Sequence, residues 1–127
     1  MIRGEVLGKQ DPYYANTCFN FATLYHTKGE YNKAEELYTE AKNIYEKVYG
    51  KHDPSYAESC NGLAGLYHIK GDFKEAETMY FEAKTIIEKV LGKQHPQYAS
   101  SCNKLAKLYR DIGNYEDSEL LYIEAKK

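Results

Sequence analysis

Residues 53–94, DPSYAESCNGLAGLYHIKGDFKEAETMYFEAKTIIEKVLGKQ, form the central copy of a repeat. Residues 11–52 match it at 23 of 42 positions, and residues 95–127 match it at 16 of 33 positions. A fixed period of this length is typical of stacked supersecondary units. We therefore divide the chain into the tail of a preceding repeat at 1–10 and three repeats at 11–52, 53–94 and 95–127, the last with a truncated second helix. We call a set of equivalent positions in the aligned copies a column. Several columns carry the same residue in all three copies: Pro12/54/96, Tyr14/56/98, Ala15/57/99, Cys18/60/102, Ala22/64/106, Leu24/66/108, Tyr25/67/109, Gly29/71/113, Tyr38/80/122 and Ala41/83/125.

The first half of each copy predicts a helix. Asp53 suits the N-cap, and Pro54 suits the first helical position because an N–H there has no partner within the helix. Gly71 ends the helix, since glycine readily adopts the left-handed conformation after a last turn. Between these signals, small and large apolar residues recur at helical spacing on one face: Ala57, Cys60, Ala64 and Tyr67.

The second half predicts another helix. Asp72 and Glu75 have the spacing of a capping box, and Gly92 ends the segment. Apolar side chains recur at steps of three and four in between: Phe73, Ala76, Tyr80, Ala83, Ile87 and Val90. A single helical hairpin cannot bury both of its faces, but stacked hairpins bury a continuous core. The sequence thus predicts an all-α solenoid of helix-turn-helix repeats, with Leu66 in its core.

Composition excludes several classes of protein. The chain has 127 residues and a net charge of −2, which disfavours nucleic acid as a partner. No apolar run approaches the roughly 20 residues of a membrane-spanning helix, so we expect no membrane partner. Met1–Glu5 are not followed by the apolar region of a secretory signal, which makes the cytoplasm the expected location.

The pattern resembles the tetratricopeptide repeat (TPR). The matching residues are Leu63-Ala64-x-x-Tyr67, followed by Gly71, Ala76, Tyr80 and Ala83. The usual unit has 34 residues, and the 42-residue form is similar to the repeats of kinesin light chains and of bacterial TPR arrays. The segments that carry this likeness are Glu88–Pro96 and Asn103–Tyr109. The resemblance implies a right-handed superhelix and a non-enzymatic scaffold for protein–protein interaction, with a peptide-binding groove along the first helices.

Carried over by position, the groove residues are Asn16, Phe19, Asn20, Thr23 and His26 in the first copy, Glu58, Asn61, Gly62, Gly65 and His68 in the second, and Ser100, Asn103, Lys104, Lys107 and Arg110 in the third. The three cations lie at steps of three, on one helical face. The two interior glycines predict a pocket opposite Phe19 and His26. We hypothesise that an acidic peptide with one bulky apolar side chain binds here. The alternatives are that these positions are only solvated, or that Asn61 and Asn103 form a structural ladder between first helices.

No catalytic, metal or cofactor site is expected. Cys18, Cys60 and Cys102 occupy an apolar face and are interpreted as small core residues. The four His are scattered, and nothing pairs a nucleophile with a base. The second helices repeat three charged columns, typical of a solvated face: Glu35/77/119, Glu40/82/124 and Lys42/84/126.

The ends suggest self-association. The last helix stops about two turns short of its counterparts, and neither end carries a polar capping helix. We expect a fragment of a longer array, or a structural array whose copies stack head to tail. The residues expected at this contact are Val6, Leu7, Leu120 and Leu121.

Overall fold

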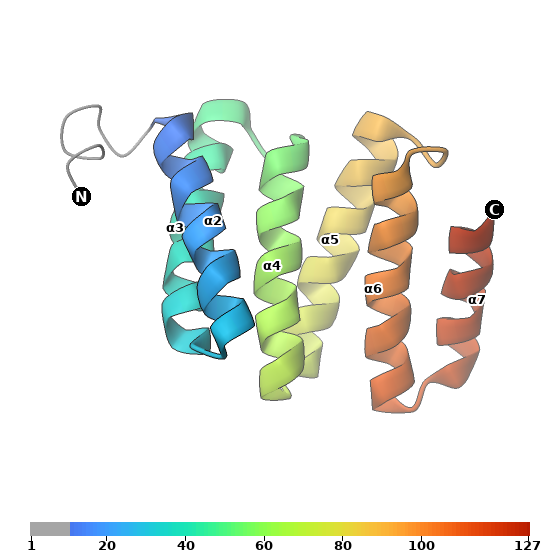
Figure 1. Ribbon diagram of the computed structural model, residues 1–127. Helices are drawn as coiled ribbons and strands as arrows, with labels where there is room; N and C mark the ends of the chain where they lie inside the picture. Colours follow the sequence, from blue (N-terminus) through green and yellow to red (C-terminus); the bar gives the residue numbers. More distant parts are fainter. Residues whose placement is uncertain (1–10) are drawn as a thin grey trace.

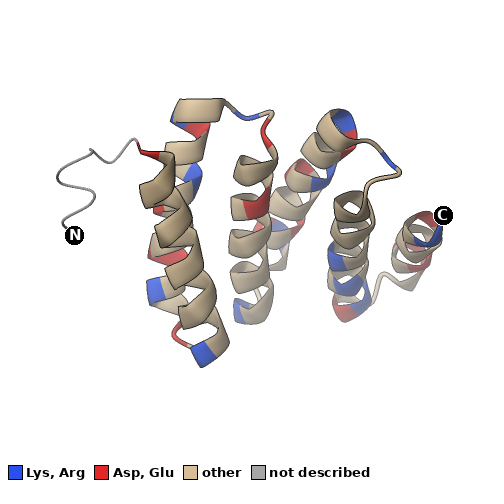
Figure 2. Cartoon of the chain, turned by 45° about the horizontal axis from the view of Figure 1, so that its top comes forward, with Lys and Arg blue, Asp and Glu red and all other residues tan. Residues whose placement is uncertain are grey.

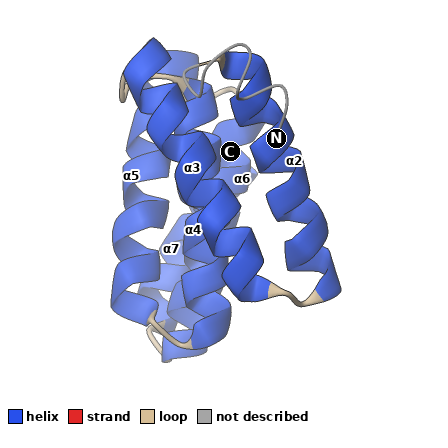
Figure 3. Cartoon of the chain, turned by 90° about the vertical axis from the view of Figure 1, so that its left-hand side faces the viewer, coloured by secondary structure: helices blue, strands red, loops and turns tan. Residues whose placement is uncertain are grey.

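The computed structural model describes residues 11–127 and contains only helices there, which confirms the all-α prediction (Figures 1 and 3). The helices are α2 (Pro12–Lys28), α3 (Tyr31–Tyr49), α4 (Pro54–Lys70), α5 (Phe73–Leu91), α6 (Pro96–Ile112) and α7 (Tyr115–Lys126). Val6 and Leu7 lie outside the described residues. No helix within this part of the chain is both long and apolar enough to cross a membrane.

The helices stand side by side in the order of the sequence, so that α2 and α7 lie at opposite ends of the stack (Figure 1). Three hairpins are formed, α2–α3, α4–α5 and α6–α7, and each second helix also packs on the first helix of the next hairpin. This arrangement is the solenoid that the repeat predicts.

The first helices begin and end as the sequence predicts. Asp53 accepts a hydrogen bond of 2.8 Å from the N–H of Ser55, and His95 uses its Nδ1 in the same way at the start of α6. Gly71 follows α4 with φ 87° and ψ 6°, the left-handed conformation. The chain then turns directly into α5, which fixes the two helices of the hairpin against each other.

The predicted capping box at Asp72 is wrong. The Asp72 side chain makes no capping hydrogen bond. The backbone N–H of Asp72 instead donates to the carbonyl of Tyr67 at 2.8 Å and closes the end of α4. In a capping box Glu75 would accept a hydrogen bond from that same N–H, so the tight turn after α4 removes the donor that the motif needs.

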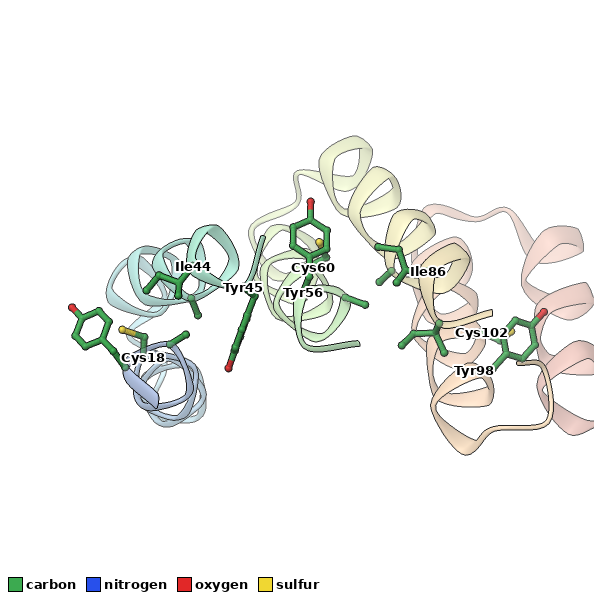
Figure 4. Packing of buried hydrophobic residues seen from close by; sticks show 14 residues of the cluster. Cys18, Ile44, Tyr45, Tyr56, Cys60, Ile86, Tyr98 and Cys102 are labelled. Atoms are coloured by element: carbon green, nitrogen blue, oxygen red, sulfur yellow. The ribbon is translucent and has the colours of Figure 1, made fainter. Parts of the chain in front are cut away.

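The core runs through all three hairpins. Cys18, Cys60 and Cys102 are fully buried and carry free thiols, one in each hairpin (Figure 4). They pack with large side chains such as Tyr56 and Ile86, which confirms their interpretation as small core residues. Leu66 is 1% exposed, as expected from its column.

Candidate functional site: a groove across the hairpins

A hollow of about 270 Å³ opens where α2, α4 and α6 face one side of the stack. Seven of its nine lining residues are among the predicted groove positions. The full lining is Phe19, His26, Tyr38, Glu58, Asn61, Gly62, Gly65, Tyr80 and Lys104. The repeat columns therefore place residues far apart in the sequence around one site.

Tyr38 occupies the space beside Gly62, which the sequence analysis expected to be open. A Cβ atom on Gly62 would lie 2.7 Å from Cε1 of Tyr38, well inside van der Waals contact. Thr23 stands on the other side, with its Oγ1 3.2 Å from the Tyr38 hydroxyl. Phe19 packs against the Tyr38 ring edge-on, with ring centroids 5.4 Å apart. Tyr38 is thus a wall of the hollow, and Gly62 makes room for that wall rather than for a ligand.

Gly65 also lines the hollow, but its surroundings leave room for a methyl group. A Cβ atom there would lie 3.6 Å from His26 and 3.7 Å from the Tyr80 hydroxyl, at ordinary contact distance. Tyr80 occupies the same repeat position as Tyr38. Gly65 and Tyr80 belong to one hairpin, whereas Gly62 and Tyr38 belong to neighbouring hairpins. The two tyrosines therefore meet the glycines of α4 from different sides of the hairpin boundary.

Both tyrosines were missed as groove residues. They come from the second helices, whereas the resemblance placed the groove on the first helices alone. The signal was available, because column 38/80/122 carries tyrosine in every copy. Burial raises the pKa of the Tyr80 hydroxyl to about 12 and also raises the pKa of the Tyr38 hydroxyl. Both hydroxyl groups therefore stay protonated at neutral pH.

Asn61 lines the hollow, and its side-chain oxygen is buried without a hydrogen-bond partner among the described residues. The residue is 6% exposed. A buried acceptor in that condition costs free energy unless a donor reaches it. Asn103, the next residue in the column, is exposed. No hydrogen bond joins the two among residues 11–127, so the structure does not support the alternative of an asparagine ladder.

Charge is distributed unevenly around the hollow. Lys104 lines it and donates to Ser100 at 3.3 Å, while Lys107 is exposed nearby on α6. Glu58 also lines it. Figure 2 shows the cations of α6 gathered along that helix. The lining of the hollow therefore includes both an ammonium group and a carboxylate.

Arg110 and His68 converge on Asp111. The His68 Nε2 lies 2.6 Å from one carboxylate oxygen, and the Arg110 Nε lies 3.4 Å from the other. The hydrogen bond from His68, with help from Arg110, holds the pKa of Asp111 below its usual range. This cluster reduces the positive charge that Arg110 was expected to contribute.

Several predicted groove residues do not line the hollow. Asn16 accepts a hydrogen bond from the Tyr45 hydroxyl, and Asn20 lines a separate shallow hollow with Thr17, Phe21 and Leu24. Thr23 contacts the Tyr38 hydroxyl but does not line the hollow. The remaining five lie along the same first helices outside the hollow: His68, Ser100, Asn103, Lys107 and Arg110.

The interpretation of the second helices as a solvated charged face is wrong for five of the six described glutamates in its columns, and among these it fits only Glu119, which is exposed. Glu40, Glu82 and Glu124 accept hydrogen bonds from Tyr14, Tyr56 and Tyr98 within each hairpin. Glu35 and Glu77 accept from tyrosines of the following hairpin, Tyr67 and Tyr109. These carboxylates are half-buried, and Glu35 and Glu77 join one hairpin to the next. Sequence spacing could not reveal them, since each pair joins different helices.

Among residues 11–127, no group of three or more His, Cys, Asp or Glu side chains is placed to hold a metal ion. The hollow offers aromatic rings, an imidazole, one amide, one carboxylate and one ammonium group. This chemistry suits recognition of a polypeptide by contact and hydrogen bonding.

Known proteins share this architecture. BtubC (BKLC) from P. vanneervenii is 22% identical over 98% of this chain and 50% of its own, with a TM-score of 0.90. A putative kinesin light chain from Podosopora anserina with nearly identical TPR-like repeats is 25% identical over 98% of this chain and 59% of its own, with a TM-score of 0.82. The chain thus spans about half the length of these proteins.

No curated protein matches the sequence significantly. The family model of the tetratricopeptide repeat matches residues 13–89 and again residues 55–127, which together cover nearly all of the chain. The hairpins, the stack and this match lead to one assignment: the chain belongs to the tetratricopeptide repeat family.

Proposed function

We propose that the protein is a non-enzymatic scaffold that binds a segment of another protein in the groove between α2 and α6. The observation that carries this proposal is the hollow itself, where an unsatisfied buried amide, two aromatic walls and an ammonium group meet. Repeats of this family generally mediate protein–protein interactions, which supports a polypeptide as the ligand.

The proposed ligand is an acidic peptide with one bulky apolar side chain. The apolar side chain enters the hollow that Gly65, His26 and Tyr80 help to line. Acidic side chains of the peptide lie over Lys104 and Lys107, where a charge-assisted hydrogen bond is stronger than a neutral one.

Fluorescence anisotropy with a labelled acidic peptide containing one Trp tests the proposal. The double variant Lys104→Glu with Lys107→Glu should weaken binding by about tenfold or more, because it places like charges against the ligand. The matched control is Lys47→Glu with Lys74→Glu, which changes the net charge equally at exposed positions outside the groove. Equal affinity of wild type and groove variant would reject the placement.

A matched series of peptides tests the second feature of the ligand. Replacing the single Trp by Ala should reduce affinity, since the hollow then stays unfilled. Replacing the acidic residues by Lys should abolish binding to the wild type. A peptide that loses neither affinity nor salt dependence in these comparisons would show that its binding does not use this hollow.

A second candidate function is a self-associating array. It is favoured by large apolar side chains that remain exposed on both end helices, Leu24 on α2 and Tyr122 on α7. Either function suits the cytoplasm, because three free thiols are typical of a reducing compartment.

A further inference from the structure

The two internal interfaces between hairpins share one set of polar contacts. At the first, the Tyr67 hydroxyl donates to Glu35 at 3.2 Å, and Lys42 lies 5.5 Å from the centre of the Tyr56 ring. At the second, the equivalent contacts join Tyr109 to Glu77 at 2.6 Å and Lys84 to the Tyr98 ring at 5.4 Å. In each case the second helix supplies Glu and Lys, and the following first helix supplies two tyrosines.

The apolar part of these interfaces also repeats. Leu63 and Leu66 of α4 are 2% and 1% exposed, and the same columns are buried in α6. Tyr38 and Tyr80 of the second helices are 3% and 5% exposed. One second-helix surface and one first-helix surface are therefore complementary in both polar and apolar groups.

α7 presents the second-helix surface without a partner among the described residues. Glu119 and Lys126 are exposed and form no ion pair or hydrogen bond within residues 11–127, although they share columns with Glu35 and Lys42. Tyr122 is 37% exposed where its counterparts are buried. These three residues line a hollow of about 470 Å³ together with Tyr115, Ser118 and Ile123.

α2 presents the complementary first-helix surface. Leu24 is 51% exposed and Phe21 is 41% exposed, in the two columns that are buried in α4 and α6. Tyr25 shares the column of Tyr67 and Tyr109, yet its hydroxyl donates to no carboxylate in the described part of the chain. The shallow hollow beside Phe21 and Leu24 measures about 300 Å³.

We infer that α7 of one copy binds α2 of a second copy in the register of the internal interfaces. In this register Tyr25 donates to the partner copy's Glu119, and Lys126 lies over the Tyr14 ring. Lys28 also approaches Glu119, as Lys70 approaches Glu35 at 2.6 Å within the chain. This inference rests on the second candidate function and names the surfaces that it uses.

The register differs from the contact that the sequence suggested. Leu121 is partly buried against core residues of its own chain and does not line the end hollow. Leu120 is 60% exposed but does not line the end hollow. The contact surface on α7 is therefore the one that includes Glu119, Tyr122 and Lys126. Because α7 and α2 carry unlike surfaces, the association is head to tail and can continue into open chains.

Two variants, each blocked at one end, test this register. Phe21→Glu with Leu24→Glu places charges in the α2 surface, and Glu119→Lys with Lys126→Glu reverses the polar groups of α7. Sedimentation equilibrium from about 10 µM to about 1 mM should show a rising mass for the wild type. Each variant alone should associate at least tenfold more weakly. Phe81→Glu is the matched control, since Phe81 is 56% exposed on α5, away from both ends.

Mixing the two variants gives the decisive result. Each retains one intact and opposite end, so an equimolar mixture should form a 1:1 dimer that grows no further. A wild type that stays monomeric throughout the range would overturn both the second candidate function and this register. Association that persists in both variants, or a mixture that stays monomeric while the wild type associates, would overturn the register alone. Peptide binding in the groove is unaffected by either outcome.

Discussion

The Tyr109 hydroxyl donates a 2.6 Å hydrogen bond to a carboxylate oxygen of Glu77, which belongs to the preceding hairpin. Tyr67 and Glu35 form the same bond one hairpin earlier. Each bond ties a first helix to the second helix before it. The stack is thus fastened by directional contacts as well as by its apolar core, and these contacts set how neighbouring hairpins are aligned.

Removing one of these hydroxyl groups should loosen the stack. Tyr109→Phe leaves Glu77 without its donor and should lower the free energy of unfolding by about 1 kcal/mol. Tyr25→Phe is the control in the same column, because no carboxylate of the described chain accepts from Tyr25. Urea unfolding at low protein concentration checks both. Equal losses for the two variants would contradict a role for the Tyr109–Glu77 bond.

The two interior glycines should respond differently to alanine. Gly65→Ala adds a methyl group at ordinary contact distance and should stabilise the protein by about 0.5–1 kcal/mol, because glycine is a poor helix former. Gly62→Ala brings its Cβ within 2.7 Å of Tyr38 and forces that buried ring to move. We expect it to lose this gain and to destabilise the protein by about 1 kcal/mol.

Chemical denaturation of Gly62→Ala and Gly65→Ala, measured side by side, provides the comparison. The sign of the difference is the result that matters. If Gly62→Ala were the more stable of the two, Tyr38 would not be fixed against α4 as the structure has it.

Leu66 and Leu24 share a column but differ in burial. Leu66→Ala should cost about 2–5 kcal/mol, since it leaves a cavity in the core. Leu24→Ala should change stability by less than about 0.5 kcal/mol, because the side chain is 51% exposed. Thermal unfolding at low concentration distinguishes them. A large loss at Leu24 would mean that its surface is covered in the isolated chain.

The buried thiols should make the protein sensitive to alkali. Burial, with a contribution from Glu82, raises the pKa of Cys60 to about 12 from its usual 9.0. Burial likewise raises the pKa of Cys18 to about 11. Folding therefore favours the protonated thiol. This contribution to stability is complete below about pH 9 and is lost as the pH rises toward the folded-state values.

Urea unfolding at pH 7 and at about pH 10.5 measures that loss, and a thiol reagent at about pH 8 supplies an independent reading. The folded protein should react slowly at all three cysteines, and the unfolded protein should react at once. The variant Cys60→Ala should show a smaller alkaline loss of stability than the wild type. Rapid labelling of the folded chain would contradict the burial on which this prediction depends.

Much of the groove could be predicted because the repeat assigns each residue to a column. Residues of one column occupy equivalent places in successive hairpins. Phe19, Gly65 and Lys104 meet in one hollow for this reason. The filling of the space at Gly62 could not be predicted. It depends on whether Tyr38 turns toward its own hairpin or toward the next one, and that choice follows from Thr23 and Gly62, which lie on different helices.

The sequence alone determined the number, length and order of the helices, since caps, glycines and a 42-residue period are local or repeated signals. Only the tertiary structure decided the partners of the charged columns. Tyr56 and Glu82 are 26 residues apart, and Tyr109 and Glu77 are 32 apart. Contacts over such separations depend on how one helix lies against another. A periodic pattern shows that Glu82 and Glu77 share a helix, but it does not show which hydroxyl group approaches each of them.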